Sequence, residues 1–196
     1  LFGYDPLKYF IGRGVLEALG IDAPIRDGDV AARGNFCTVD EHGLLTDRRA
    51  GRIPTAESMP LCQLLDSIEV DTAETIVLPV QDYRFVLLLR GEGLSDRISE
   101  TDPQRTGALP LPVSAFAPEA ERTEVIANAF LQRAAEVLHD REIANMVLLR
   151  GFSKIPELPP MGKAYNLNPA AIAAYPMYRG LAHVIGMKVI PTGHSF

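Results

Sequence analysis

The spacing of apolar residues along the chain changes repeatedly between a helical period and an extended one, as is typical of a protein that mixes helices and strands. Apolar positions that recur every three or four residues predict helices over residues 6–19, 55–68, 119–141, 169–175 and 176–185. Short apolar or β-branched runs predict strands over residues 29–39, 44–47, 76–80, 84–90, 145–149 and 187–190. The pattern predicts an α/β (α+β) fold, in which helices cover a mixed, largely antiparallel sheet with hairpins.

Local signals refine the ends of these elements. Gly20 is well placed to end the first helix, although Gly12 and Gly14 weaken its middle. Thr55 is the expected N-terminal cap of the second helix, with Ser58 as an alternative. Prolines and glycines interrupt any regular period over residues 91–118, and this predicts a long ordered loop of the kind that often carries function.

Composition restricts the class of protein. The 196 residues are 47% hydrophobic and 22% charged, so we expect one domain over residues 1–196 that buries one substantial core. A net charge of −6 argues against a general nucleic-acid binder, because such proteins carry a basic excess. No apolar run approaches the ~20 residues of a membrane span and no signal peptide opens the chain, so we expect a cytoplasmic protein with no membrane partner.

The residues that usually carry metals or nucleophiles are scattered. Cys37 and Cys62 have no metal or redox spacing, which predicts two buried thiols in a reducing cytosol. No paired ligand spacing relates the four histidines, His42, His139, His183 and His194. No serine occupies a Gly-x-Ser-x-Gly turn. We therefore assign no catalytic residue and no metal ligand in this chain.

Arginines stand beside glycines in three stretches, Arg33-Gly-Asn-Phe36, Asp47-Arg-Arg-Ala-Gly-Arg52 and Leu89-Arg-Gly-Glu-Gly-Leu-Ser95. Arginine offers a planar fork of donors that matches phosphate or carboxylate, and glycine lets backbone N–H groups approach the same anion. This combination indicates a phosphorylated substrate. Arg90 and Arg150 each end a predicted strand before a glycine, which favours a site that they share.

Several short motifs, in the order in which they occur, resemble those of the archaeal-type cofactor-independent (2,3-bisphosphoglycerate-independent) phosphoglycerate mutases. They are Leu1-Phe-Gly-Tyr-Asp-Pro6, Gly12-Arg-Gly14, Arg33-Gly-Asn-Phe36, Asp47-Arg-Arg-Ala-Gly-Arg-Ile53, Leu89-Arg-Gly-Glu-Gly-Leu-Ser95, Thr101-Asp-Pro103 and Leu149-Arg-Gly151. The resemblance covers nearly the whole chain, and the number of matched motifs makes it specific.

The resemblance implies an enzyme of the alkaline phosphatase superfamily that interconverts 3-phosphoglycerate and 2-phosphoglycerate in glycolysis. It implies a phosphoserine intermediate and a two-metal site, with manganese or a similar divalent ion as the cofactor. The nucleophilic serine and the metal ligands of the family lie outside the matched motifs. The chain is therefore expected to be the central inserted domain of a longer mutase, inactive and metal-free alone, with its own catalytic core as partner.

Such a domain would hold phosphoglycerate and exclude water while the molecule reorients. The candidate substrate-binding residues are Arg13, Arg33, Arg48, Arg49, Arg52, Arg90 and Arg150. Among them Arg49 and Arg52 are favoured, followed by Arg13 and Arg33. Two alternatives stay open, namely a related metal-dependent phosphotransferase for another small metabolite, and a structural or interaction domain whose arginines pair with nearby carboxylates.

Overall fold

The computed structural model describes residues 2–5, 8–9 and 11–191. Its helices are α1 (Arg13–Gly20), α2 (Thr55–Asp66), α3 (Glu121–Leu138), α4 (Met161–Tyr165) and α5 (Pro176–Val184), with short 3-10 turns at Ala50–Arg52 and Pro118–Ala120. Its strands are β1 (Val30–Val39), β2 (Leu45–Asp47), β3 (Glu74–Pro79), β4 (Arg84–Arg90), β5 (Met146–Ser153), β6 (Ala170–Ile172) and β7 (Lys188–Ile190). The predicted fold class, a mixed α/β fold with a largely antiparallel sheet, is confirmed.

Strand β1 is the centre of the main sheet. Arg33 in β1 pairs with Val86 of β4 and also with Arg150 of β5, so these two strands lie on opposite edges of β1. Strand β3 lies outside β4 in a hairpin, and β2 pairs with the C-terminal end of β1. All of these pairings are antiparallel.

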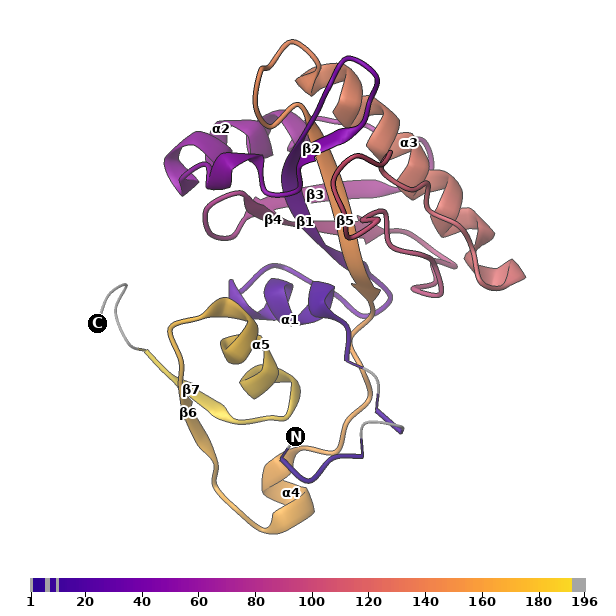
Figure 1. Cartoon of the computed structure of the whole chain (residues 1–196). Coiled ribbons are helices and arrows are strands. Elements are labelled where there is room, and N and C mark those ends of the chain that lie inside the picture. Colours follow the sequence, from indigo (N-terminus) through magenta and orange to yellow (C-terminus); the bar gives the residue numbers. More distant parts are fainter. Residues whose placement is uncertain (1, 6–7, 10, 192–196) are drawn as a thin grey trace.

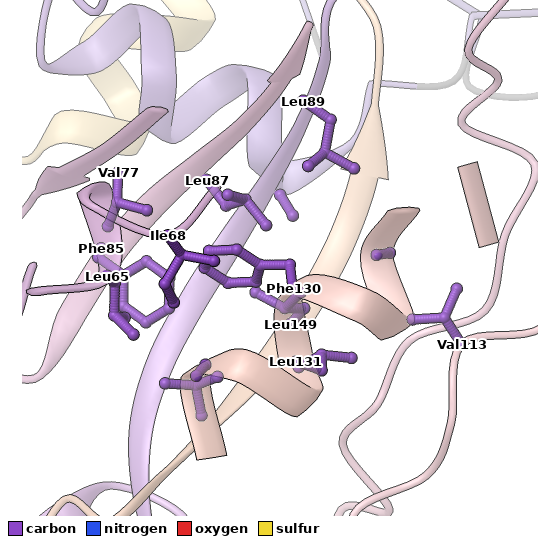
Figure 2. Packing of buried hydrophobic residues seen from close by; sticks show 14 of the residues in the cluster. Leu65, Ile68, Val77, Phe85, Leu87, Leu89, Val113, Phe130, Leu131 and Leu149 are labelled. Carbon is purple, nitrogen blue, oxygen red and sulfur yellow. The ribbon is translucent and has the colours of Figure 1, made fainter. Parts of the chain in front are cut away.

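The main hydrophobic core lies between this sheet and the helices α2 and α3. Alternate residues of the strands, such as Phe36, Phe85 and Leu149, are fully buried on this face. Figure 2 shows side chains of the sheet, α2 and α3 meeting in this core, with Phe130 of α3 at its centre. Gly34 also belongs to this face, where a Cβ atom would collide with the ring of Phe85.

The opposite face of the sheet is covered by α1, and α5 packs on the outer side of α1 (Figure 1). The two helices approach closely because two of their contacts use glycine. A Cβ atom on Gly20 would collide with the backbone of Pro176, and one on Gly180 would collide with the carbonyl group of Leu16. Helix α1 is consequently buried on two sides, and all of its residues except Arg13 and Leu19 are buried.

Helix α5 connects β6 to β7, and these two short strands pair in parallel, apart from the main sheet (Figure 1). An apolar depression beside them is lined by residues of this β6–α5–β7 unit, including Ile172, Tyr175 and Tyr178. Ile172 is 75% exposed and Tyr178 is 60% exposed, so this unit presents apolar surface to solvent.

Three expectations from the sequence are wrong in detail. The first predicted helix begins at Arg13 with Gly12 as its N-cap, and residues 6, 7 and 10 lie outside the described residues. Thr55 does not cap α2 but accepts a hydrogen bond from the backbone N–H of Asp82. Residues 169–175 do not form a helix, because residues Ala170–Ile172 pair with β7 as a strand.

Candidate functional site

Arginines from three adjacent strands lie on the α1 side of the sheet. Because side chains alternate along a strand, Arg33 of β1, Arg84 of β4 and Arg150 of β5 point away from the main core. Arg33 and Arg150 are direct cross-strand partners, as are Asn35 and Arg84, and such partners have Cβ atoms roughly 4.5–5.5 Å apart. We call Arg33, Arg84 and Arg150 the arginine face.

Helix α1 places a carboxylate over this face. The Glu17 side chain is 0% exposed, and its Oε1 atom lies 3.4 Å from Nη1 of Arg33. Neither carboxylate oxygen accepts a hydrogen bond from any described residue. Burial raises the pKa of Glu17, and the positive charges of Arg33, Arg84 and Arg13 oppose that rise. Glu17 is therefore a counter-ion for these arginines, and its carboxylate oxygens accept no hydrogen bond from the described residues.

Arg84 is held by aromatic rings. Its guanidinium carbon lies 5.3 Å from the ring centroid of Tyr83 and 5.8 Å from that of Tyr175, which is the residue before α5. Burial alone would lower the pKa of Arg84, but Tyr175, Tyr83 and Glu17 raise it above its usual value. Its Nε–H group is buried and donates to no described residue.

Arg150 joins the arginine face to a loop. Asp102 accepts two hydrogen bonds from Arg48, at 2.8 and 2.7 Å, and its Oδ2 lies 3.2 Å from Nη1 of Arg150. Arg150 also donates from Nε to Glu100 at 3.3 Å. Burial would raise the pKa of Asp102, but hydrogen bonds from Arg48 and from the backbone N–H of Gln104 lower it. Asp102 therefore links two of the predicted arginines.

Arg90 lies further along the sheet than this group, and a site that it shares with Arg150 stays a prediction. It ends β4 next to Leu89, the partner of Val30, whereas Arg150 pairs further along β1 with Arg33. Its guanidinium group donates to the buried Asp29, to Glu74 and to the carbonyl of Pro24. These contacts tie the ends of β3 and β4 to the loop before β1.

Arg49 and Arg52 project from a strained turn. Ala50, Gly51 and Arg52 all have positive φ angles, of 45°, 64° and 55°, which is costly for the two non-glycine residues. Asp47 stabilises the turn by accepting hydrogen bonds from the backbone N–H groups of Arg49 and Gly51. Both arginines are exposed, and no described residue forms a hydrogen bond or ion pair with either guanidinium group.

Glycines beside the arginines have several roles. Gly34 is required by the ring of Phe85 on the other face of the sheet, so it does not open the backbone near Arg33 to an anion. Gly151 has a φ of 61° and lies against Arg13 at the start of α1. By contrast, a Cβ atom on Gly51 or Gly93 would meet nothing within 4 Å, although both have positive φ angles.

Cysteines and metal ligands play no visible part in this site. Cys37 and Cys62 are free and buried, as predicted, and burial raises the pKa of Cys62 to about 12. Within the described ranges, no group of three His, Cys, Asp or Glu residues is arranged to hold a metal ion. No helix in the same part of the chain is long and apolar enough to cross a membrane.

Sequence reasoning missed Arg84, Glu17 and Asn35, which complete the polar group around Arg33. A signal for Arg84 exists, because it shares the parity of Val86 and Leu88 in its strand and therefore their face of the sheet. No comparable signal exists for Glu17, which is buried where α1 packs on the sheet against Arg33.

Comparisons with known proteins agree on one family. A model of the 2,3-bisphosphoglycerate-independent phosphoglycerate mutase family matches residues 1–144. A probable mutase of this kind from Thermus thermophilus is 48% identical over 193 residues, covering 97% of this chain and 48% of that protein. One from Thermotoga maritima is 45% identical over 197 residues, covering 100% of this chain and 49% of that protein.

A solved structure is similar over nearly the whole chain. The cofactor-independent phosphoglycerate mutase from Thermoplasma acidophilum superposes with a TM-score of 0.72 at 32% sequence identity, covering 98% of this chain and 55% of that one. The chain thus spans about half the length of the curated relatives it matches. With a family model that covers most of its residues, the chain belongs to the 2,3-bisphosphoglycerate-independent phosphoglycerate mutase family.

Proposed function

We propose that this chain is the substrate-holding part of a phosphoglycerate mutase that interconverts 3-phosphoglycerate and 2-phosphoglycerate in glycolysis. The observation that carries the proposal is that arginines outnumber carboxylates at and around the arginine face. Five arginines (Arg13, Arg33, Arg48, Arg84 and Arg150) stand near three carboxylates (Glu17, Glu100 and Asp102). A substrate with a phosphate and a carboxylate supplies the missing negative charge.

The arginines would act by binding and orienting the substrate. Holding the glycerate part in place turns the return of the phosphoryl group into a step within one complex, and covering it excludes water. Arg49 and Arg52 suit this role because both are exposed and no described residue forms a hydrogen bond or ion pair with their guanidinium groups. Arg48 and Arg90 carry bidentate contacts to Asp102 and Asp29, which favour a structural role for those two.

The phosphoserine intermediate and the divalent metals belong to the proposal for the whole protein. The described residues do not fit a metal centre, because no suitable group of ligands is present among them. We therefore assign both to the protein's catalytic core, which is the proposed partner of this chain in the cytoplasm. The exposed apolar surface of the β6–α5–β7 unit is consistent with such a partner.

Replacing Arg52 with Ala is expected to reduce mutase turnover roughly tenfold to a hundredfold, since a charge-assisted hydrogen bond contributes about 1.5–3 kcal/mol. The fold should be retained, because Arg52 is exposed and Ala keeps a non-glycine residue at the same positive φ. Conversion of 3-phosphoglycerate in the presence of manganese measures the effect on the protein at its full encoded length.

The matched control is Arg133→Ala, which removes an exposed arginine from α3, outside the candidate site. Turnover of this control should equal that of the unmodified protein. Unchanged turnover after Arg52→Ala would remove Arg52 from the substrate-binding residues.

A further inference from the structure

We propose that Arg84 binds an anionic group of the substrate together with Arg33, and that Glu17 is a positioning residue that holds both guanidinium groups before the substrate arrives. The inference rests on the proposed function and adds to it two residues and a division of roles. It places the binding group under α1, at the junction of the sheet with the β6–α5–β7 unit.

The unused hydrogen-bonding capacity of the described residues is concentrated at this point. Among the described residues, the buried side-chain atoms that have no hydrogen-bond partner are both oxygens of Glu17, Nε of Arg33, Oδ1 of Asn35 and Nε of Arg84. Asn35 and Arg84 are cross-strand partners, and Arg33 lies two positions from Asn35 on the same face. Buried polar groups are nearly always paired in proteins, so a group of unpaired ones at one place indicates a missing binding partner.

The unpaired atoms have the character that a phosphoglycerate requires. The Nε–H groups of Arg33 and Arg84 are donors and suit the oxygens of a carboxylate or phosphate. The Oδ1 atom of Asn35 is an acceptor and suits a hydroxyl group. The same small molecule can therefore satisfy both kinds of group.

Glu17 neutralises this group only in part. Its single negative charge faces three positive ones among the described residues, those of Arg33, Arg84 and Arg13. At 3.4 Å from Arg33, it attracts that guanidinium without forming a hydrogen bond. The arginines are thus oriented by Glu17 while their donors stay available for the substrate.

Arg84 is also fixed from its other side. The rings of Tyr83 and Tyr175 contact its guanidinium group, and Tyr175 is held in place by the docking of α5 on α1. A side chain that is already ordered loses little conformational entropy when it binds. This arrangement makes Arg84 a pre-organised binding residue.

The test compares Arg84→Ala with Arg133→Ala in the protein at its full encoded length. Arg84→Ala should raise KM for 3-phosphoglycerate by roughly tenfold or more, as expected for loss of a charged hydrogen bond, while the control leaves KM unchanged. Titration calorimetry with 3-phosphoglycerate gives the same comparison without turnover. An Arg84→Ala protein with KM and Kd within about twofold of the unmodified protein would overturn the inference.

Glu17→Gln separates positioning from a structural role. We expect its KM to rise several-fold with kcat nearly unchanged, and its melting temperature to fall, because the amide leaves the charges of Arg33 and Arg84 without their counter-ion. A lower melting temperature with an unchanged KM would show a purely structural ion pair. If the unmodified protein has no mutase activity, the proposed function fails, and calorimetry still decides the roles of Arg84 and Glu17.

Discussion

Asp102→Asn is expected to lower the free energy of unfolding by about 3 kcal/mol, because removing one partner of a buried ion pair leaves the other charges uncompensated. The Asp102 side chain is 1% exposed and accepts hydrogen bonds from Arg48 and from the backbone N–H of Gln104. Arg150 keeps Glu100 as a partner, but Arg48 keeps only the carbonyl of Gln104. The melting temperature should fall by roughly 6–12 °C.

Chemical denaturation at several pH values checks this result. The pKa of Asp102 is lowered in the folded protein. Its contribution to the free energy of unfolding is therefore present above the pKa of about 3.9 that an aspartate has in the unfolded chain, and it is lost as the pH falls below that value. The difference between the two proteins should therefore be largest near neutral pH and shrink below about pH 4. The exposed Asp71 provides the matched control, Asp71→Asn, which should be neutral. Equal stability of Asp102→Asn and the control at neutral pH would contradict this role of Asp102.

Gly180→Ala is expected to weaken the docking of α5 on α1 and to destabilise the protein by roughly 2–3 kcal/mol. A Cβ atom at this position would collide with the carbonyl oxygen of Leu16, and a backbone atom cannot rotate away as a side chain can. The two helices would have to separate. Because Tyr175 precedes α5 and contacts Arg84, substrate binding should weaken as well.

Thermal denaturation and the KM for 3-phosphoglycerate measure these two effects on the same variant. The matched control is Gly91→Ala, where the new Cβ atom would lie 3.4 Å from the carbonyl oxygen of Thr72, an ordinary contact. This control should change neither quantity appreciably. If Gly180→Ala and the control have the same melting temperature, the close approach of the two helices is not needed for stability.

The elements of the main sheet could be predicted from local pattern. The apolar run of β1, the hairpin of β3 and β4, and the long amphipathic face of α3 each lie within one stretch of sequence. Residues 169–175 differ, because their alanines favour a helix. They form β6 instead because pairing with β7, across α5, overrides that local preference.

The candidate site is less accessible from sequence, for a physical reason. Arg33 can be found because it lies in a motif, but Arg84 stands in an ordinary strand with no motif around it. Its importance comes from Tyr175, a residue far along the chain that the docking of α5 brings against it. The burial of Glu17 likewise depends on the packing of α1 on the sheet against Arg33. Such contacts are set by tertiary structure, and the local pattern indicates only the face of the sheet on which Arg84 lies.

The proposed role of this chain is to hold phosphoglycerate for a mutase. It is tested by the conversion of 3-phosphoglycerate to 2-phosphoglycerate with manganese, by the protein at its full encoded length and by the 196-residue chain side by side. We predict activity in the former and none in the latter. A folded full-length protein that leaves 3-phosphoglycerate unchanged would contradict the proposed role.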